Sequence, residues 1–265
     1  MKYAFIGGGN MGRALAAALV GKGVCLAEDI LVVEPAEAAR ERVANLGCVV
    51  AEQIDAAVSE APVVLLAVKP QSAPHMFEQL KPHLKANQVV VSIMAGVTID
   101  TVHNALEHEA IVRVMPNTPA QVGLGMNVYH AAPTVTGTQL RAVEALLQAS
   151  GESLAVANED AIDAATAVSG SGPAYVFYIA EHWTNAALKL GFTAEEAEQL
   201  VQQTLIGATA LWKDQRVPPA TLREQVTSKG GTTAAALEHF EQHEIGKHFE
   251  EGVERAYQRA KELGG

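Results

Sequence analysis

YAFIGGGNMG, residues 3–12, is the stretch that decides the fold of this chain. Its first four residues are apolar and predict a short strand that is buried on both faces. Gly7, Gly9 and Gly12 then fit the G-x-G-x-x-G pattern, and Met11–Val20 predicts a helix directly after it. A strand, a glycine-rich turn and a helix in this order are typical of a dinucleotide-binding Rossmann domain.

The glycine-rich turn predicts where the phosphates of a dinucleotide bind. Gly7 permits the tight turn, Gly9 lets the backbone approach the pyrophosphate, and Gly12 permits close contact between helix and strand. The positive N-terminus of the helix attracts phosphates without a basic side chain; the plain alternative is a structural turn. We expect the cofactor to contact Ile6, Gly7, Gly8, Gly9, Asn10, Met11 and Gly12.

Glu34 bears on which cofactor is used. It ends the second predicted strand, where a carboxylate accepts hydrogen bonds from the ribose hydroxyls and repels a 2′-phosphate. This position favours NADH. Arg40 and Arg42, on the next predicted helix, are close enough to hold a 2′-phosphate if the Glu34 side chain turns away. The residues alone leave the choice between NADPH and NADH open.

The N-terminal part alternates short apolar runs with longer amphipathic ones, which favours a parallel sheet with helices on both faces. The predicted strands are Tyr3–Ile6, Ile30–Val33, Val63–Ala67, Val89–Ile93, Ile111–Val114 and, closing the sheet, about Ser153–Ala157. The predicted helices are Met11–Val20, Glu37–Leu46, Ala73–Leu84, Ile99–Leu106 and one that runs from a capping box at Thr136 and Gln139 to about Ser150. We therefore predict an α/β fold, with a Rossmann-type, doubly wound, mostly parallel sheet in residues 1–157.

Loops at the carboxyl ends of the strands line the ligand crevice of such a sheet. The loop after Val63–Ala67 contains Lys69, for which an ordinary surface lysine is the alternative, and Pro70 stiffens it. Small residues follow the strand Val89–Ile93, and a loop with two prolines follows Ile111–Val114. We expect further cofactor contacts from Ala67, Val68, Lys69, Pro70, Ala95, Gly96 and Asn117.

No strand pattern continues beyond about Asn158, so residues 158–265 are predicted to form an all-helical domain. Its predicted helices are Pro173–Leu190, Ala194–Trp212, Pro219–Val226, Thr232–Gln242 and Gly246–Leu263. Gln199–Trp212 contains no charged residue, and a helix of that kind is buried almost all round. A small domain has little interior for such a helix, which favours burial between subunits over a central core helix.

Composition excludes several other classes of protein. The 265 residues are 49% hydrophobic, enough to bury a core, and their formal net charge of -11 argues against nucleic acid or an anionic membrane surface as the main partner. No signal-peptide pattern and no apolar run of about 20 residues is present. Cys25 and Cys48 are too few for a disulfide framework and lack metal-site spacing. We expect a cytoplasmic protein without a metal.

Two motifs stand out in the helical part. SGSGPAY, residues 169–175, is predicted to break one helix and start another, with Pro173 in the permitted first turn. TSKGGTT, residues 227–233, precedes an alanine-rich helix and offers free backbone N–H groups, two glycines and several hydroxyls at its N-terminus. This is a suitable cradle for a small carboxylate, and plain helix capping is the alternative.

With these motifs, the chain resembles the Δ1-pyrroline-5-carboxylate reductases, which catalyse the last step of proline biosynthesis. The resemblance spans almost the whole length, and the two helical motifs are its most specific part. The matching segments are the glycine-rich start, Ala67–Pro70, Ala95–Thr98, Asn117–Pro119, Ser169–Tyr175 and Ser228–Thr233. The family often has Pro where this chain has Lys229, a departure that leaves the glycines and Thr233 intact.

The resemblance implies hydride transfer from a reduced nicotinamide cofactor to the imine carbon of pyrroline-5-carboxylate, giving L-proline. It favours NADPH, whereas Glu34 favours NADH, so we expect both cofactors to be used with modest discrimination. The resemblance implies that the Thr233 hydroxyl bonds the ring nitrogen and is the catalytic group. The carboxylate would be held by the backbone and hydroxyls of the segment made up of Ser228, Gly230, Gly231, Thr232 and Thr233. It also implies a homodimer with interleaved helical domains, assembled in some members into rings of dimers.

Two rival functions remain. A β-hydroxyacid dehydrogenase has a similar start and a helical second domain, but it needs a catalytic Lys with Asn four residues later, a spacing this chain lacks. A non-catalytic dinucleotide sensor would use the helical domain to bind a partner. A basic or helix-turn-helix segment would favour the sensor, and the sequence contains neither.

Overall fold

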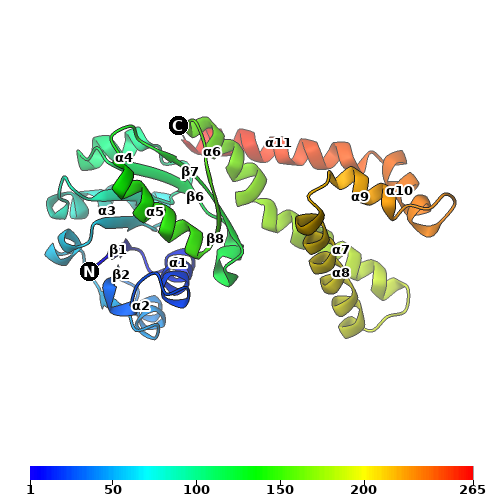
Figure 1. The fold of residues 1–265 in the computed structure, drawn as a ribbon, viewed down its shortest axis with the longest axis horizontal. Coiled ribbons are helices and arrows are strands. Elements are labelled where there is room, and N and C mark those ends of the chain that lie inside the picture. Colours follow the sequence, from blue (N-terminus) through cyan, green and yellow to red (C-terminus); the bar gives the residue numbers. More distant parts are fainter. Residues whose placement is uncertain (265) are drawn as a thin grey trace. The chain divides into compact units, whose positions relative to one another are not determined.

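The computed structural model describes residues 1–264, which divide into two compact units. Unit 1 combines Met1–Pro173 with the chain from Ala256 onward, and unit 2 is Ala174–Arg255. Figure 1 labels the helices and strands of both units. The domain boundary between residues 157 and 158 stays a prediction.

Unit 1 is built on one mostly parallel sheet, which confirms the predicted fold class. Its strands lie in the order β3-β2-β1-β4-β5-β6-β7-β8. β7 pairs antiparallel with β6 and parallel with β8, and the other neighbours are parallel. The strands are β1 (Tyr3–Ile6), β2 (Ile30–Val33), β3 (Val49–Ala51), β4 (Val63–Leu66), β5 (Val89–Ser92), β6 (Ile111–Met115), β7 (Gly125–Ala131) and β8 (Gly151–Ala155).

Helices cover both faces of this sheet, because the strands are apolar on both faces (Figure 1). Along β1, Phe5 packs into the core on one face, whereas Ala4 and Ile6 pack into the core on the other. The first core includes side chains of α1 and α5, and the second includes side chains of α3 and α4. The helices of the sheet region are α1 (Asn10–Gly21), α2 (Glu37–Ala44), α3 (Ala73–Leu80), α4 (Ile99–Leu106) and α5 (Gly137–Ala149).

Both cysteines are free and buried in the first core. Burial, together with the nearby Cys25, raises the pKa of the Cys48 thiol to about 11. The thiol therefore stays protonated at neutral pH, where it acts as a small apolar side chain.

Several predicted boundaries were wrong. The predicted helix 73–84 ends at Leu80, because Pro82 turns the chain into the short 3-10 helix η4 (Lys81–His83). The last strand begins at Gly151 instead of residue 153: Gly151 has a φ of 152° and packs directly on Gly125, where a side chain would overlap the backbone. Strands β3 and β7 were not predicted.

The motif at residues 169–175 separates two helical elements and starts α7, with Pro173 in its first turn, as predicted. α6 (Glu159–Ala165) passes into a π-helical turn, η6 (Thr166–Gly170), and α7 begins at Gly172. The Ser171 N–H donates to the Thr166 carbonyl at 2.8 Å, the widened bond of a π turn. Gly170 lies beside β6, where a Cβ would be 2.7 Å from the end of the flexible Met115 side chain.

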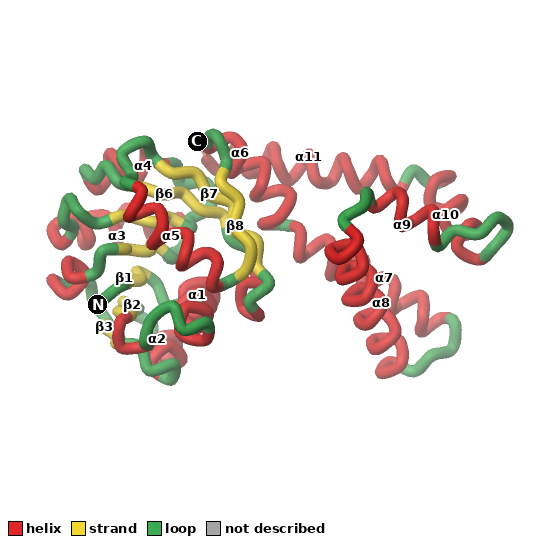
Figure 2. The backbone as a smooth tube through the Cα atoms, in the orientation of Figure 1, coloured by secondary structure: helices red, strands yellow, loops and turns green. Residues whose placement is uncertain are grey.

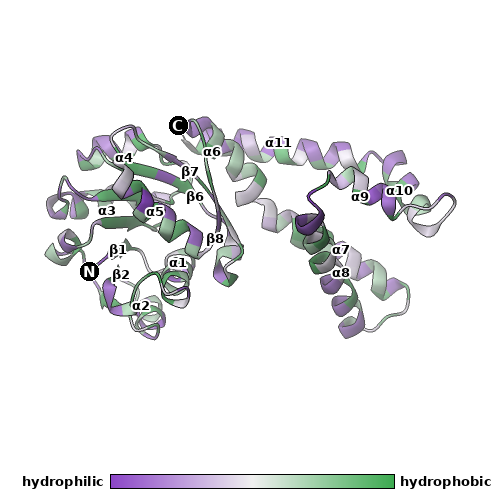
Figure 3. Ribbon diagram, in the orientation of Figure 1, coloured by the Kyte–Doolittle hydropathy of each residue, from purple (hydrophilic) through white to green (hydrophobic). Residues whose placement is uncertain are grey.

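In residues 174–255, all of which the structure describes, Figure 2 shows helix and loop without a strand. The helices of the C-terminal part are α7 (Gly172–Lys189), α8 (Ala194–Gln215), α9 (Pro219–Gln225), α10 (Thr232–Gln242) and α11 (Ile245–Gly264). The uncharged stretch of α8 is not a central core helix of the chain, because Ile206, Leu211 and Trp212 are each about half exposed. Figure 3 shows hydrophobic residues along α7 and α8.

Candidate cofactor and substrate sites

Two glycines of the glycine-rich turn are required by close backbone contacts, and the third is not. A Cβ on Gly7 would lie 2.6 Å from the Ala67 carbonyl oxygen, and the φ of Gly7 is 112°, so the turn against β4 requires glycine. A Cβ on Gly12 would overlap the Gly7 carbonyl oxygen. Gly9 differs, because a Cβ there meets no atom within 4 Å. The open side of the loop is therefore at Gly9.

The start of α1 suits an anionic group. Gly9 is the N-cap, without a side-chain capping bond, and the first turn contains no acidic residue. The first N–H groups of a helix lack intrahelical partners and attract negative charge. The residues present therefore fit the pyrophosphate of a dinucleotide.

Glu34 lies beside this loop, at the end of β2. Its carboxylate accepts from the Gly8 N–H at 2.8 Å and from the Ala36 N–H at 2.9 Å. The Arg40 guanidinium donates to the Glu34 and Pro35 carbonyls at 2.8 and 3.0 Å. Glu34 is thus held toward the loop, and Arg40 is occupied by backbone oxygens.

The strand-end loops of the prediction lie at the same edge of the sheet. Ala67 and Val68 are half-buried against Gly7, whereas Lys69 is exposed. Gly96 has a φ of 72°, and a Cβ there would overlap the Leu263 carbonyl oxygen at the end of α11. The backbone that packs closely against Gly96 is therefore that of Leu263 in the same chain.

Asn117 uses its side-chain amide to fix the loop after β6. Its Nδ2 donates to the Ser169 carbonyl at 3.0 Å, and its Oδ1 accepts from the Met126 N–H at 2.8 Å. Asn117 thereby joins the end of β6 to β7 and to the π turn. A contact between Asn117 and the cofactor stays a prediction.

The predicted substrate residues lie in unit 2, at the turn before α10. The Gly231 N–H donates to the Ser228 carbonyl at 3.0 Å, and Gly230 has a φ of 73°. Lys229 is exposed at the second position of this turn, a position that proline also favours. α10 begins at Thr232 without a side-chain cap, and Thr233 is half-buried in its first turn.

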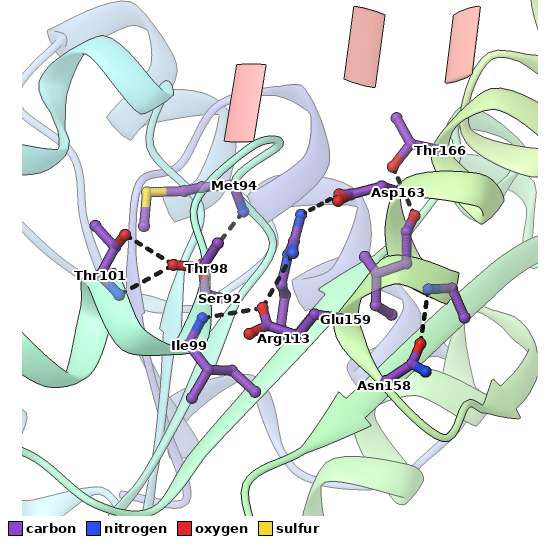
Figure 4. A network of polar contacts seen from close by, with 12 residues as sticks. Ser92, Met94, Thr98, Ile99, Thr101, Arg113, Asn158, Glu159, Asp163 and Thr166 are labelled. Carbon is purple, nitrogen blue, oxygen red and sulfur yellow. Dashed lines mark hydrogen bonds and ion pairs between the residues drawn. The ribbon is translucent and has the colours of Figure 1, made fainter. Parts of the chain in front are cut away.

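The sequence interpretation missed a buried ionic network. Arg113 of β6 is only 2% exposed, and its guanidinium donates to Glu159 at 3.0 Å and to Asp163 at 2.6 Å (Figure 4). An arginine in the middle of an apolar strand was the available signal, because a buried charge needs a partner. Its partners lie on α6, far along the chain.

Within residues 1–264, no group of three or more His, Cys, Asp or Glu side chains is arranged to hold a metal ion. None of the helices described is both long enough and apolar enough to cross a membrane.

Comparison with known proteins also separates an N-terminal oxidoreductase part from a C-terminal helical part. A family model described as pyrroline-5-carboxylate reductase dimerisation matches residues 159–263. A second model, described as NADP oxidoreductase coenzyme F420-dependent, matches residues 2–96. The chain therefore carries a domain through which its family oligomerises.

Full-length relatives agree with the two models. A pyrroline-5-carboxylate reductase of Pseudomonas aeruginosa is 39% identical over 99% of this chain and 96% of its own. The structure of a pyrroline-5-carboxylate reductase from Coxiella burnetii has a TM-score of 0.92 at 35% identity, covering 100% of this chain and 98% of the other. A pyrroline carboxylate reductase of Plasmodium falciparum, solved with NADP bound, has a TM-score of 0.90 at 29% identity and the same coverage. The chain belongs to the pyrroline-5-carboxylate reductase family.

Proposed function

We propose that this protein reduces 1-pyrroline-5-carboxylate to L-proline with a reduced nicotinamide dinucleotide. The observation that carries the proposal is the uncapped start of α10 behind the Ser228–Gly231 turn, in a chain with an open dinucleotide loop at Gly9. One element suits a small carboxylate, and the other suits a pyrophosphate. Adding the imine to purified protein and NADPH, and following the absorbance of the reduced cofactor, tests the proposal.

The cofactor would be held mainly by backbone. The N–H groups at the start of α1 would bind the pyrophosphate, and Glu34 would accept from the ribose hydroxyls with its remaining lone pairs. The bound nicotinamide supplies the hydride. The remaining cofactor contacts would come from the loops after β4, β5 and β6: Ala67, Val68, Lys69, Pro70, Ala95, Gly96 and Asn117.

The substrate would be held by the turn before α10. The Ser228 hydroxyl and the backbone N–H groups of Gly231, Thr232 and Thr233 would bind its carboxylate, and the Thr233 hydroxyl would bond the ring nitrogen. An imine protonates readily in water, so the site needs no strong protein acid. Positioning two bound molecules can supply about 7–11 kcal/mol of the barrier reduction.

We further propose a homodimer formed through the helical domain, with α8 at its interface. The support is the half-exposed apolar face of α8 in the single chain. Assembly of dimers into a ring stays a prediction. The two free, buried cysteines support a cytoplasmic location, where thiols remain reduced.

Thr233→Val is expected to lower kcat about 10- to 150-fold, because a hydrogen bond to a partly charged nitrogen contributes about 1.5–3 kcal/mol. Valine keeps the shape and the β-branching of threonine and removes only the hydroxyl. KM for the imine should change less, since the bond strengthens in the transition state. NADPH binding should not change.

Ser228→Ala is the matched comparison for this prediction. A carboxylate contact serves ground state and transition state alike, so this variant should raise KM more than it lowers kcat. If Thr233→Val retains full turnover, Thr233 is only a helix residue and the imine site is wrongly assigned.

Glu34→Ser is expected to shift cofactor preference toward NADPH. We propose that the wild type uses both cofactors with modest discrimination, because the family favours NADPH whereas the Glu34 carboxylate repels a 2′-phosphate. Serine removes this repulsion. The measurement is the ratio of kcat/KM for the two cofactors. An unchanged ratio would show that Glu34 does not face the ribose.

A further inference from the structure

We propose that Glu159 is a positioning residue for the turn between β5 and α4, residues 93–98, and through it for the nicotinamide. The inference rests on the proposed function for its substrate, and on unit 1 alone for its geometry. The strand order reverses between β1 and β4, which is where a dinucleotide crosses the sheet. The glycine-rich loop and Glu34 lie on the β1–β2 side, so the β5–α4 turn serves the nicotinamide half.

Glu159 fixes the end of this turn directly. Its Oε1 accepts from the Ile99 N–H at 3.0 Å, the first N–H of α4. The neighbouring N-cap, Thr98, accepts from the Thr101 N–H at 3.1 Å. The turn therefore enters α4 through two capping bonds, and one of them comes from a residue 60 positions away.

The same carboxylate oxygen belongs to the Arg113 network. It accepts from Arg113 Nη1 at 3.0 Å, while Arg113 Nη2 donates to Asp163 at 2.6 Å (Figure 4). Arg113 is buried, and its two partners are only 25% and 16% exposed. Buried charges are tolerated only while they stay paired, so this network sets one position of Glu159 against β6 and α4.

The turn has a second fixed contact at Gly96, where the backbone of Leu263 packs against the glycine. Ala95 and Gly96 therefore lie between two anchors, Leu263 on one side and Glu159 at Ile99 on the other. A backbone held in this way can present a nicotinamide ring at one distance and angle. Catalysis by positioning depends on that constancy, because misplacement of about 1 Å can cost about 100-fold in rate.

Glu159→Ala tests the role, and Asn158→Ala is its matched control. The Asn158 side chain caps the same helix, α6, by accepting from the Ala161 N–H at 3.1 Å. Both variants weaken the start of α6, but only the first removes the bond to Ile99 and one carboxylate partner of Arg113. For each we would measure the melting temperature, the dissociation constant for the reduced cofactor by fluorescence, and kcat and KM.

We expect Glu159→Ala to lower kcat about 10-fold or more while KM for the imine stays within about 3-fold. Cofactor binding should weaken too. Asn158→Ala leaves Arg113 paired, so it should lose less melting temperature and should change neither kcat nor the cofactor dissociation constant. Glu159→Gln keeps an acceptor for the Ile99 N–H, so it should recover most of the turnover and serves if the alanine variant does not fold. Equal losses of kcat in Glu159→Ala and Asn158→Ala, or no recovery with glutamine, would overturn the inference. A wild type that binds the cofactor without reducing the imine would contradict the proposed function, and the cofactor dissociation constants would still decide the role of Glu159.

Discussion

Gly9→Val is expected to abolish binding of the reduced dinucleotide while unit 1 stays folded. The space around Gly9 is open, so a valine meets no protein atom near its Cβ and the fold is not strained. The same space is where the pyrophosphate must approach the backbone, and a side chain there keeps it away. Fluorescence titration with NADPH measures the binding, and circular dichroism measures the fold.

Two glycines within α1 provide the comparison. Gly12→Val should prevent normal folding, because its Cβ would overlap the Gly7 carbonyl. Gly21→Val, at the other end of the helix, also has open space around its Cβ and should bind the cofactor normally. Near-normal affinity in Gly9→Val would mean that the phosphate loop is wrongly assigned.

Ile206→Asp is expected to break the assembly. Ile206 lies in the middle of the uncharged stretch of α8 and is 55% exposed in the single chain. An aspartate therefore costs little within the monomer, whereas at a subunit interface it buries an unpaired charge at a cost of several kcal/mol. Sedimentation velocity should show monomer or aggregate in place of the wild-type oligomer.

Ile206→Val is the control, since it keeps an apolar, β-branched side chain and should keep the wild-type sedimentation coefficient. An Ile206→Asp protein that sediments like the wild type would remove α8 from the interface. A wild type that is monomeric, folded and active would remove the interface altogether.

Most elements of the fold could be predicted from patterns of neighbouring residues. The strands β1 and β2 were predicted with the bounds that the structure has, because continuous apolar runs end at glycine or at an acidic residue. The predicted capping box at Thr136 is formed, since this motif depends on residues three positions apart.

Features that depend on distant partners were not predictable in the same way. β7 escaped prediction because Asn127 interrupts its apolar pattern. That side chain is buried, and its amide donates to the Leu147 carbonyl and the Ser150 hydroxyl. For the same reason, Arg113 could be suspected of needing a partner, but nothing local points to Glu159 or Asp163. The same holds for the site residues. The sequence predicts the loop in which each one lies, but the hydrogen bonds that orient Glu34 and Asn117 are formed with distant residues and appear only in the folded chain.

The contact between Gly96 and Leu263 also has a consequence for the order of folding. Unit 1 draws its residues from both sides of unit 2 in the sequence, so a ribosome making about 5–20 residues per second delivers the sheet well before the segment that packs on Gly96. The sheet can form during synthesis, whereas the turn after β5 must wait for a long-range closure, which is the slower kind of step. In a nascent chain stalled before residue 256, the strands β1–β6 should therefore already resist protease. The turn after β5, residues 93–98, should remain sensitive.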